Sequence, residues 1–157
     1  VLREKDLTEE EYTALAARIL TDAPEYLRQH LVIHNYPGAA LKLKVPGIHL
    51  PLGVLKDMNE TRPDLLHRFD TVGTSVHSAD DALEAVRCGA SYLFAGNVWE
   101  TTCKPGLGGR GPEFLKEVAQ SVSIPVYGIG GVSEERMPEI LATGAAGGCM
   151  MSGFMNI

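Results

Sequence analysis

Short apolar runs alternate with amphipathic segments along most of the chain. After Thr8 and the acidic residues Glu9–Glu11, apolar residues recur at the spacing of one helix face; they are Tyr12, Leu15, Ala16, Ile19 and Leu20. A threonine followed by acidic residues is typical of a helix N-terminus. We therefore predict a helix that begins after Thr8.

Seven short runs are predicted as strands because they are rich in β-branched, aromatic or other apolar residues. They are Val1–Lys5, Leu31–Asn35, Gly47–Leu50, Thr71–His77, Tyr92–Val98, Ile124–Gly131 and Gly148–Gly153. Further helices are predicted from Pro37, from Pro63 to Phe69, from Ser78 to Gly89, over Leu115–Val122, and from Ser133 to Gly144. A polar loop is expected between Pro51 and Pro63.

The alternation of strands and helices favours an α/β architecture with a parallel sheet. A doubly wound open sheet, a flavodoxin-like sheet and a (β/α)8 barrel all accept it. Nearly every predicted strand ends in polar, charged or small residues, which are Arg3 and Lys5, His34 and Asn35, His49, Ser75 and His77, Asn97, Gly130 and Gly131, and Ser152. Functional groups at many strand ends are typical of a barrel, whereas an open sheet gathers them at one switch point. We therefore predict a (β/α)8 TIM barrel.

The length of 157 residues is short for such a barrel, which usually has roughly 250 residues. Residues 1–157 are therefore expected to form a single, N-terminally incomplete TIM-barrel domain. The parts expected to be missing are the first strand and helix and the end of the last helix.

The composition is acidic, with 14 Lys and Arg against 20 Asp and Glu and a formal net charge of -6. No nucleic-acid partner is expected, because phosphate backbones bind positive surfaces. Three cysteines suggest no disulfide framework, and no apolar run is long enough to cross a bilayer. We expect a cytoplasmic protein with no membrane partner and leave open whether it forms a homo-oligomer.

Glycines and a serine end the last two predicted strands and point to phosphate binding. The residues concerned are Gly130, Gly131, Met151 and Ser152. Backbone N–H groups at such strand ends bind phosphate in many barrels, in the loops after strands 7 and 8. The alternative is that these glycines only allow tight turns.

Residues 106–111 satisfy the pattern Gly-Xaa-Gly-Xaa-Xaa-Gly. A dinucleotide site is nevertheless rejected, because the glycines do not follow their strand closely and position 131 is a glycine where an acidic residue is required. We expect a loop over the strand ends, in which Lys104 and Arg110 can meet an anion, or an ordinary solvated loop.

Two cations lie at the end of the first predicted strand. Arg3 and Lys5 are two residues apart and share one face, which suits a phosphate or pyrophosphate group. The alternatives are that they pair with carboxylates of the barrel or are solvated.

Three histidines at predicted strand ends are candidate general bases, because imidazole titrates near neutrality. They are His34, His49 and His77, of which His77 is preferred since Ser75 shares its face. A hydrogen-bonding role is an equally good interpretation of each. No Cys and His set has the spacing of a zinc site, so no metal site is expected.

Six ordered motifs resemble the thiamine-phosphate synthase and TenI (thiazole tautomerase) superfamily. They are Leu2–Lys5, Gly47–Leu50, Gly73–Ser78, Gly96–Lys104, Ile124–Gly131 and Met151–Gly153. The resemblance implies a (β/α)8 barrel that acts on the phosphorylated thiazole and the pyrimidine pyrophosphate of thiamine biosynthesis.

The synthase branch is similar to this chain at the positions that hold the pyrimidine and its pyrophosphate, which are Arg3, Lys5, Ser75, Thr101 and Lys104. It also implies two magnesium-binding aspartates. Those positions are Asn35 and Val54 here, and an amide with an alkyl group lacks the anionic oxygens that Mg²⁺ prefers.

The TenI branch resembles the chain more closely in its loops, over His49–Gly53, Ser75–Ser78, Glu100–Lys104, Gly106–Leu107 and Gly109–Gly111. Its tautomerase reaction needs proton transfer and a phosphate anchor but no cofactor or metal. The resemblance implies a histidine base where this chain has Asn97, so another histidine would have to act.

Three functions follow from the resemblance. The first is a TenI-like tautomerase that acts on or binds a phosphorylated thiazole. The second is a regulatory or binding homologue without catalysis. The third is a thiamine-phosphate synthase, which alone would require Mg²⁺.

Overall fold

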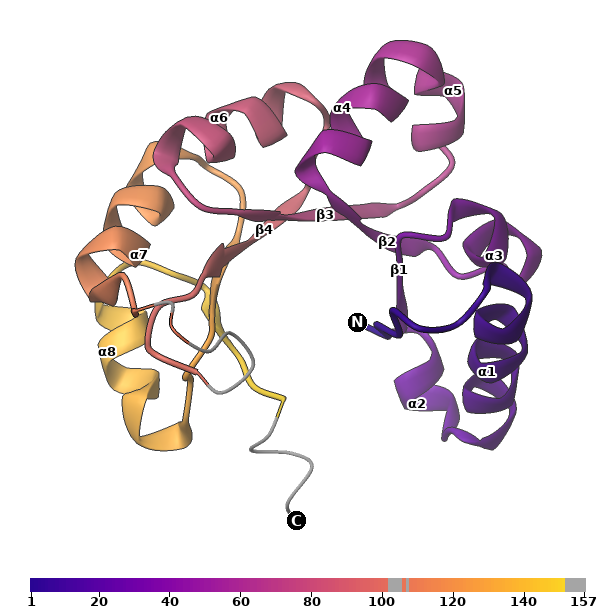
Figure 1. Ribbon diagram of the computed structural model, residues 1–157, viewed down its shortest axis with the longest axis horizontal. Helices are drawn as coiled ribbons and strands as arrows, with labels where there is room; N and C mark the ends of the chain where they lie inside the picture. Colours follow the sequence, from indigo (N-terminus) through magenta and orange to yellow (C-terminus); the bar gives the residue numbers. More distant parts are fainter. Residues whose placement is uncertain (102–105, 107, 152–157) are drawn as a thin grey trace. The chain divides into compact units, whose positions relative to one another are not determined.

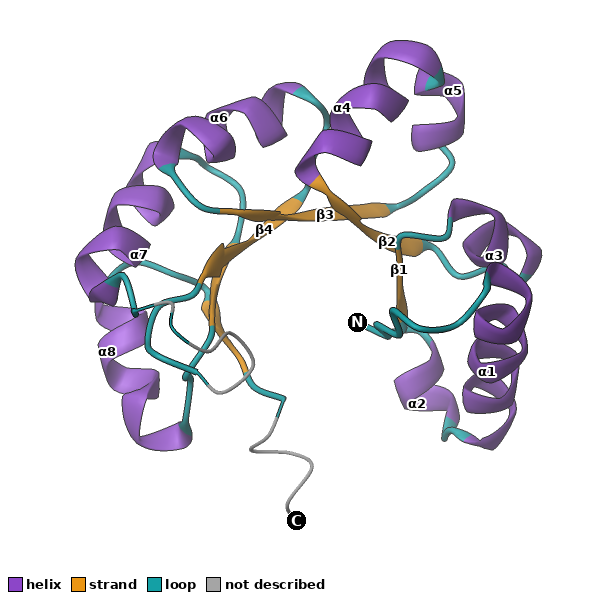
Figure 2. Cartoon of the chain, in the orientation of Figure 1, coloured by secondary structure: helices purple, strands orange, loops and turns teal. Residues whose placement is uncertain are grey.

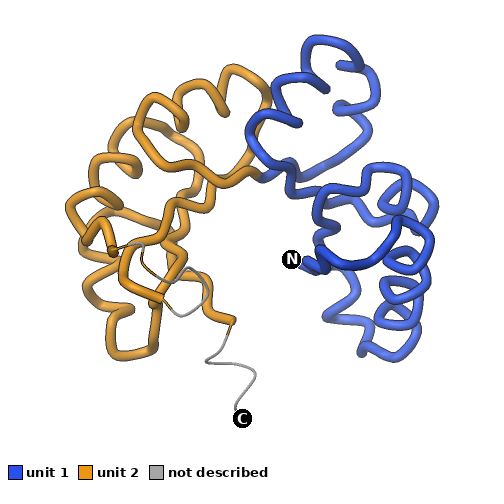
Figure 3. Tube along the Cα trace, in the orientation of Figure 1, with its two compact units in different colours: residues 1–73 blue, residues 74–157 orange. Residues whose placement is uncertain are grey.

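The computed structural model describes residues 1–101, 106 and 108–151 (Figure 1). The chain forms two compact units, Val1–Gly73 and Thr74–Ile157 (Figure 3). Strand β3, Thr71–Val76, contains the boundary between them.

The first unit contains five helices and two strands besides the start of β3. They are α1 (Glu9–Asp22), α2 (Glu25–Arg28), β1 (Val32–His34), α3 (Pro37–Lys42), β2 (Gly47–Pro51), α4 (Leu52–Thr61) and α5 (Pro63–Leu66). The helix predicted after Thr8 is confirmed as α1. Its first turn is a capping box, in which the Thr8 hydroxyl accepts from the Glu11 N–H and the Glu11 carboxylate accepts from the Thr8 N–H.

Strands β1 and β2 pair in parallel, with Ile33 opposite Ile48 and His34 opposite His49. Both isoleucines are fully buried, and α3 packs on the two strands. Successive side chains of a strand point to opposite faces, so the histidine pair lies on the other face from the isoleucines. The pairing register thus brings the two histidines together.

Residues 1–5 do not form the predicted strand. Leu2 alone makes a bridge, parallel to Ile33, with its N–H donating to the Val32 carbonyl over 2.9 Å. The charged residues 3–6 that follow are all exposed, so no burial of side chains favours extending the ladder. The prediction of a strand over Val1–Lys5 was wrong beyond this bridge.

Helix α4 occupies the segment predicted as a polar loop. Its only buried side chains are Leu55 and Met58, which are three residues apart and share one face. The other positions are polar or partly exposed, which hid the helical period in the sequence. Pro51 ends β2 but also precedes the first turn of α4, so it does not start a loop.

The second unit alternates strands and helices regularly. After β3 come α6 (Ala79–Arg87), β4 (Tyr92–Gly96), α7 (Gly111–Ser121), β5 (Val126–Ile129), the 3-10 turn η1 (Glu134–Arg136), α8 (Met137–Ala142) and β6 (Gly147–Cys149). These elements match the predicted ones, although the strands are shorter. Ser78 caps α6 as predicted, with its hydroxyl accepting from the Asp81 N–H over 3.0 Å.

Helices α7 and α8 cover one face of β4, β5 and β6 (Figure 2). Ala95 is opposite Gly128 in the register, and a Cβ on Gly128 would lie 2.9 Å from the Leu115 side chain of α7. On the other face, Phe94 is opposite Tyr127, with ring centroids 6.2 Å apart. The small residues therefore admit the helix, and the aromatic residues fill the opposite face.

The described residues contain six strands, one fewer than the seven predicted, and their order in the sheet is the order of the chain. The pairs β1–β2, β4–β5 and β5–β6 are parallel. This confirms the predicted α/β fold with parallel strands. Within the second unit, the parallel pairing brings the carboxyl ends of β4, β5 and β6 to one edge.

The Tyr12 hydroxyl forms hydrogen bonds that connect the first residues of the chain to β1, and a substitution at this position tests their contribution to stability. The side chain is fully buried, and its hydroxyl donates to the Leu2 carbonyl (2.7 Å) and accepts from the His34 N–H (3.0 Å). We expect Tyr12→Phe to lower the free energy of unfolding by about 1–2 kcal/mol, because buried partners lose hydrogen bonds. Urea unfolding measures this. Tyr26→Phe, at a side chain that is 66% exposed, is the control and should change little.

Candidate functional site

In the second unit, backbone hydrogen bonds continue between the two segments that follow β4 and β5. The Val98 N–H donates to the Ile129 carbonyl (2.9 Å), and the Trp99 N–H donates to the Gly130 carbonyl (3.0 Å). A Cβ on Gly131 would lie 2.6 Å from that of Trp99. The glycine pair Gly130–Gly131 is thus required by close approach, as well as by its φ angles of 95° and 63°.

The carbonyl oxygens of the glycine pair are both bound within the unit. Gly130 accepts from Trp99, and Gly131 accepts from the Arg136 guanidinium. In a planar trans peptide the N–H points opposite to the C=O. The N–H groups of Gly131 and Val132 therefore point away from these donors. Two neighbouring N–H groups that point the same way, with their carbonyl oxygens turned to the other side, are suited to binding an anion such as phosphate.

Asn97 ties the loop at residues 108–111 to the end of β4. Its side chain is buried, and the amide nitrogen donates to the carbonyls of Trp99 (3.3 Å) and Gly108 (3.4 Å). Its main-chain carbonyl accepts from the Arg110 N–H over 3.1 Å. An amide can make these contacts but cannot titrate. Asn97 therefore holds the loop and is not a base.

His77 follows β3 and connects it to the ends of two other segments. Its Nδ1 lies 2.6 Å from the Gly96 carbonyl oxygen, and its N–H donates to the Asp81 carboxylate. Because a carbonyl only accepts, Nδ1 carries the proton and Nε2 keeps a lone pair. The His77 carbonyl accepts from the Arg110 guanidinium, which also lies over the Phe114 ring. This tautomer leaves Nε2 as an acceptor or base.

The first unit contains the second group of predicted site residues. The rings of His34 and His49 are stacked, with centroids 5.9 Å apart. Burial, with smaller effects of His34, the chain's amino terminus and Arg3, lowers the pKa of His49 to about 3. Burial and the charges of Arg3 and Lys5 also lower the pKa of His34. Both imidazoles are neutral at pH 7 and are weak bases there.

The two positions that the synthase resemblance assigns to magnesium do not fit that ion. Asn35 has a φ of 60° and donates its N–H to the His49 carbonyl. Val54 on α4 has an alkyl side chain that is 37% exposed. Within residues 1–101, 106 and 108–151, no three His, Cys, Asp or Glu side chains lie close enough to hold a metal. Mg²⁺ prefers carboxylate oxygens, and this pair offers none.

The remaining predicted residues are less closely grouped. Ser75 lies on β3, and both it and Thr101 are half-buried and have interaction partners. Met151 is 64% exposed. Lys104 and Ser152 lie outside the described residues. The structure therefore groups His77, Asn97, Gly130 and Gly131 in one unit and Arg3, Lys5, His34 and His49 in the other.

Sequence reasoning missed Trp99 and Arg136. The Arg136 guanidinium lies 4.8 Å from the centroid of the Trp99 ring in addition to binding Gly131. One signal was present in the sequence, because Trp99 is the single tryptophan of the chain and directly follows a predicted strand end. The partner could not be identified, since Arg136 is 37 positions further along, in a segment predicted only as helix.

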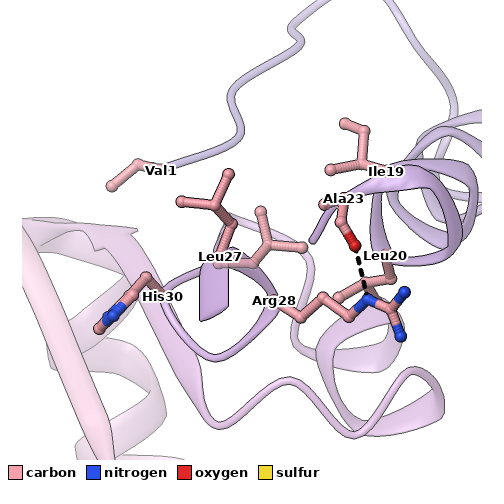
Figure 4. A pocket seen from close by; sticks show the side chains of 8 residues that line it. Val1, Ile19, Leu20, Ala23, Leu27, Arg28 and His30 are labelled. Carbon is pink, nitrogen blue, oxygen red and sulfur yellow. Dashed lines mark hydrogen bonds between the residues drawn. The ribbon is translucent and has the colours of Figure 1, made fainter. Parts of the chain in front are cut away.

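A cavity of about 280 Å³ lies elsewhere in the first unit (Figure 4). It is lined by Val1, Ile19, Leu20, Ala23, Leu27, Arg28, His30 and Leu31. The Arg28 side chain donates to the Ala23 carbonyl over 2.8 Å, so its guanidinium is bound to the backbone. The lining is mostly apolar and includes none of the predicted site residues, so it is not the candidate site.

None of the helices in the described part of the chain has the length and apolar character that a bilayer crossing requires.

Comparison with known proteins identifies the family. Residues 1–154 match the family described as thiamine monophosphate synthase. The chain belongs to this family. The superfamily resemblance in the motifs is thereby confirmed.

Individual members of the family are similar to this chain along most of its length. The thiamine-phosphate synthase of Clostridium acetobutylicum is 32% identical over 155 residues, covering 99% of this chain and 72% of the relative. The thiamine-phosphate synthase of Caldivirga maquilingensis is 46% identical over 129 residues, and the match covers 80% of this chain and 60% of the relative. A third such synthase, from Caldanaerobacter subterraneus, is covered over 64% of its length. The chain therefore spans between three fifths and three quarters of these relatives.

Solved structures agree with the fold. Thiamine phosphate pyrophosphorylase from Pyrococcus furiosus has a TM-score of 0.78 and 28% identity, and the match covers 99% of this chain and 73% of that one. FabK from Thermotoga maritima has a TM-score of 0.69 at 21% identity, and the match covers 96% of this chain and 49% of that one. The second likeness concerns the fold alone.

The buried histidine predicts how stability depends on pH. The pKa of His49 falls from 6.5 to about 3 on folding, so below pH 6.5 the unfolded chain binds a proton that the folded chain does not. Its contribution to stability is therefore complete above about pH 6.5 and is lost as the pH falls toward 3. Acidification from pH 7 to 5 should cost about 2 kcal/mol through this group.

Urea unfolding at a series of pH values measures how the free energy of unfolding changes with pH. His49→Gln keeps a neutral polar side chain and should flatten the dependence between pH 7 and 5. His30→Gln, at an exposed histidine, is the control. An identical slope in wild type and His49→Gln would contradict the prediction.

Proposed function

We propose that the chain carries out the reaction of a thiamine-phosphate synthase, joining a phosphorylated thiazole to a pyrimidine pyrophosphate. The observation that carries this proposal is the name shared by the relatives at 32% and 46% identity. We further propose that its strands belong to a (β/α)8 barrel and that residues 1–157 are part of a single such domain. The reaction is therefore a transfer, rather than the isomerisation that the loop motifs favoured.

The thiazole phosphate would bind at the glycine pair. The N–H groups of Gly131 and Val132 point away from the donors that bind the neighbouring carbonyls. Arg136 adds a positive charge beside them in a chain with a formal net charge of -6. Met151 and Ser152, which follow β6, complete the proposed phosphate site.

The pyrimidine pyrophosphate would be held by Arg3, Lys5, Ser75, Thr101 and Lys104. In the transfer, a thiazole nitrogen forms a bond to the pyrimidine methylene carbon. The bond from that carbon to the pyrophosphate oxygen breaks, and pyrophosphate leaves with the electron pair. Cations stabilise the leaving group because negative charge accumulates on it. Since Asn35 and Val54 do not fit Mg²⁺, no step is assigned to a metal ion.

A thiazole tautomerase is the second candidate, and the geometry of His77 favours it. With Nδ1 held by the Gly96 carbonyl, Nε2 is available to accept a proton. The similarity of the glycine loop to the TenI branch supports the same reaction. A binding homologue without catalysis is what remains if neither activity is found.

The synthase proposal is tested by incubating the purified protein with thiazole phosphate and pyrimidine pyrophosphate, with and without Mg²⁺. Thiamine phosphate is then oxidised to a fluorescent thiochrome and quantified. We expect formation above the rate of the reaction without protein. No product at high protein concentration, together with thiazole phosphate binding by calorimetry, would overturn the transferase assignment and leave the tautomerase and the binding homologue.

Gly131→Ala sharpens this test. The new Cβ would lie 2.6 Å from Trp99 and 2.7 Å from the Glu100 carbonyl, so the pair must separate from β4. We expect affinity for thiazole phosphate to fall by about tenfold or more. Gly144→Ala is the matched control, because Gly144 also has a positive φ but nothing lies within 4 Å of its Cβ position. Equal losses in both variants would contradict a site at Gly131.

His77→Asn separates the two candidate reactions. Asparagine keeps a donor near the position of Nδ1 but removes the Nε2 lone pair. If His77 is a general base, tautomerisation of the thiazole substrate should fall by about 100-fold or more. The synthase rate should change little in the same variant. An unchanged tautomerase rate would exclude His77 as its base.

A further inference from the structure

We propose that Arg136 is a positioning residue, which sets the orientation of the glycine pair so that its N–H groups receive the phosphate of the substrate. This inference rests on the proposed function and names a residue for it. Arg136 lies in the turn η1, five residues after Gly131. It acts through Gly131 and through Trp99, on two different loops.

Arg136 makes two contacts with its side chain. Its guanidinium donates to the Gly131 carbonyl and lies over the Trp99 ring, with its central carbon 4.8 Å from the ring centroid. Trp99 in turn donates its N–H to the Gly130 carbonyl. One side chain therefore connects the loop after β5 to the loop after β4. The contact with the indole restricts where the guanidinium can lie, and it therefore restricts the direction of the N–H donors.

The contact with the Gly131 carbonyl acts on the peptide between Gly131 and Val132. Gly131 has a φ of 63°, and glycine can exchange such a conformation for others at little cost. If the carbonyl had no donor, this peptide could turn and present its oxygen to an incoming phosphate, which would repel it. The bond from Arg136 prevents that rotation. The energy of a hydrogen bond from a charged donor is enough to select one orientation.

The neighbouring Glu135 is exposed, and its pKa is lowered first of all by a hydrogen bond with the Ser133 side chain and to a smaller extent by the charge of Arg136. The contacts of the Arg136 guanidinium with the Gly131 carbonyl and the Trp99 ring are the ones on which a positioning role rests.

The test uses Arg136→Met and Arg136→Lys, with Arg87→Met as the matched control. Arg87 is an exposed arginine on α6 that forms a surface ion pair with Glu84. Trp99 is the single tryptophan, so its fluorescence reports directly on this site. Acrylamide quenching of Trp99 should increase in Arg136→Met and stay unchanged in Arg87→Met. Circular dichroism and thermal unfolding verify that each variant is folded.

Calorimetry with thiazole phosphate and with inorganic phosphate then measures binding. We expect Arg136→Met to weaken thiazole phosphate binding about tenfold to a hundredfold, the range for one charged hydrogen bond. In the synthase assay, KM for the thiazole should rise while kcat and KM for the pyrimidine pyrophosphate stay near wild type. Arg136→Lys should also bind more weakly than wild type, because an ammonium group cannot stack and bind the carbonyl in one plane.

The outcomes are distinguishable. Wild-type affinity in Arg136→Met overturns the inference and leaves the proposed function standing. Wild-type affinity in Arg136→Lys shows that charge alone matters, and it also overturns the positioning role. Unchanged quenching of Trp99 in Arg136→Met shows that the contact is not made in solution. If the wild-type protein binds neither probe, the proposed function fails, and the inference fails with it.

Discussion

The continued pairing of β4 and β5 beyond their strand residues is the constraint on which the second unit depends. Two backbone hydrogen bonds, from Val98 to Ile129 and from Trp99 to Gly130, bring the two loops into contact. Only glycine fits at positions 130 and 131 at such a distance. The same pairing places Trp99 where Arg136 can stack on it, and Asn97 where it can hold Gly108. The chemistry of the site therefore follows from a main-chain arrangement.

The two groups of candidate residues differ in what their surroundings do to them. In the first unit, burial keeps His34 and His49 neutral, so they can donate or accept hydrogen bonds but resist protonation. In the second unit, His77 is exposed and has its tautomer set by the Gly96 carbonyl. Residues that look equivalent as strand-end histidines thus have different chemical capacities. Burial cannot be judged from the pattern around a single histidine.

Most elements could be predicted from the sequence because their periodicity and caps agree, as at Thr8 and Ser78. Helix α4 could not, since only Leu55 and Met58 face inward. The strand expected at the start failed because charged residues follow Leu2. For the candidate site, glycines and histidines could be proposed from residue type alone. The roles of Asn97, Trp99 and Arg136 depend on contacts between distant positions, which no local pattern contains.

Because Gly128 has no side chain, the space beside it restricts which substitutions this sequence can accept during evolution. This space is filled by Leu115 of α7, which approaches to 2.9 Å of where a Cβ would be. A larger residue at 128 would push α7 away from β4 and β5, unless position 115 became smaller at the same time. Such paired changes pass through an intermediate with either a clash or a void. Homologues are thus expected to keep the two residues or to exchange both, so positions 128 and 115 should covary.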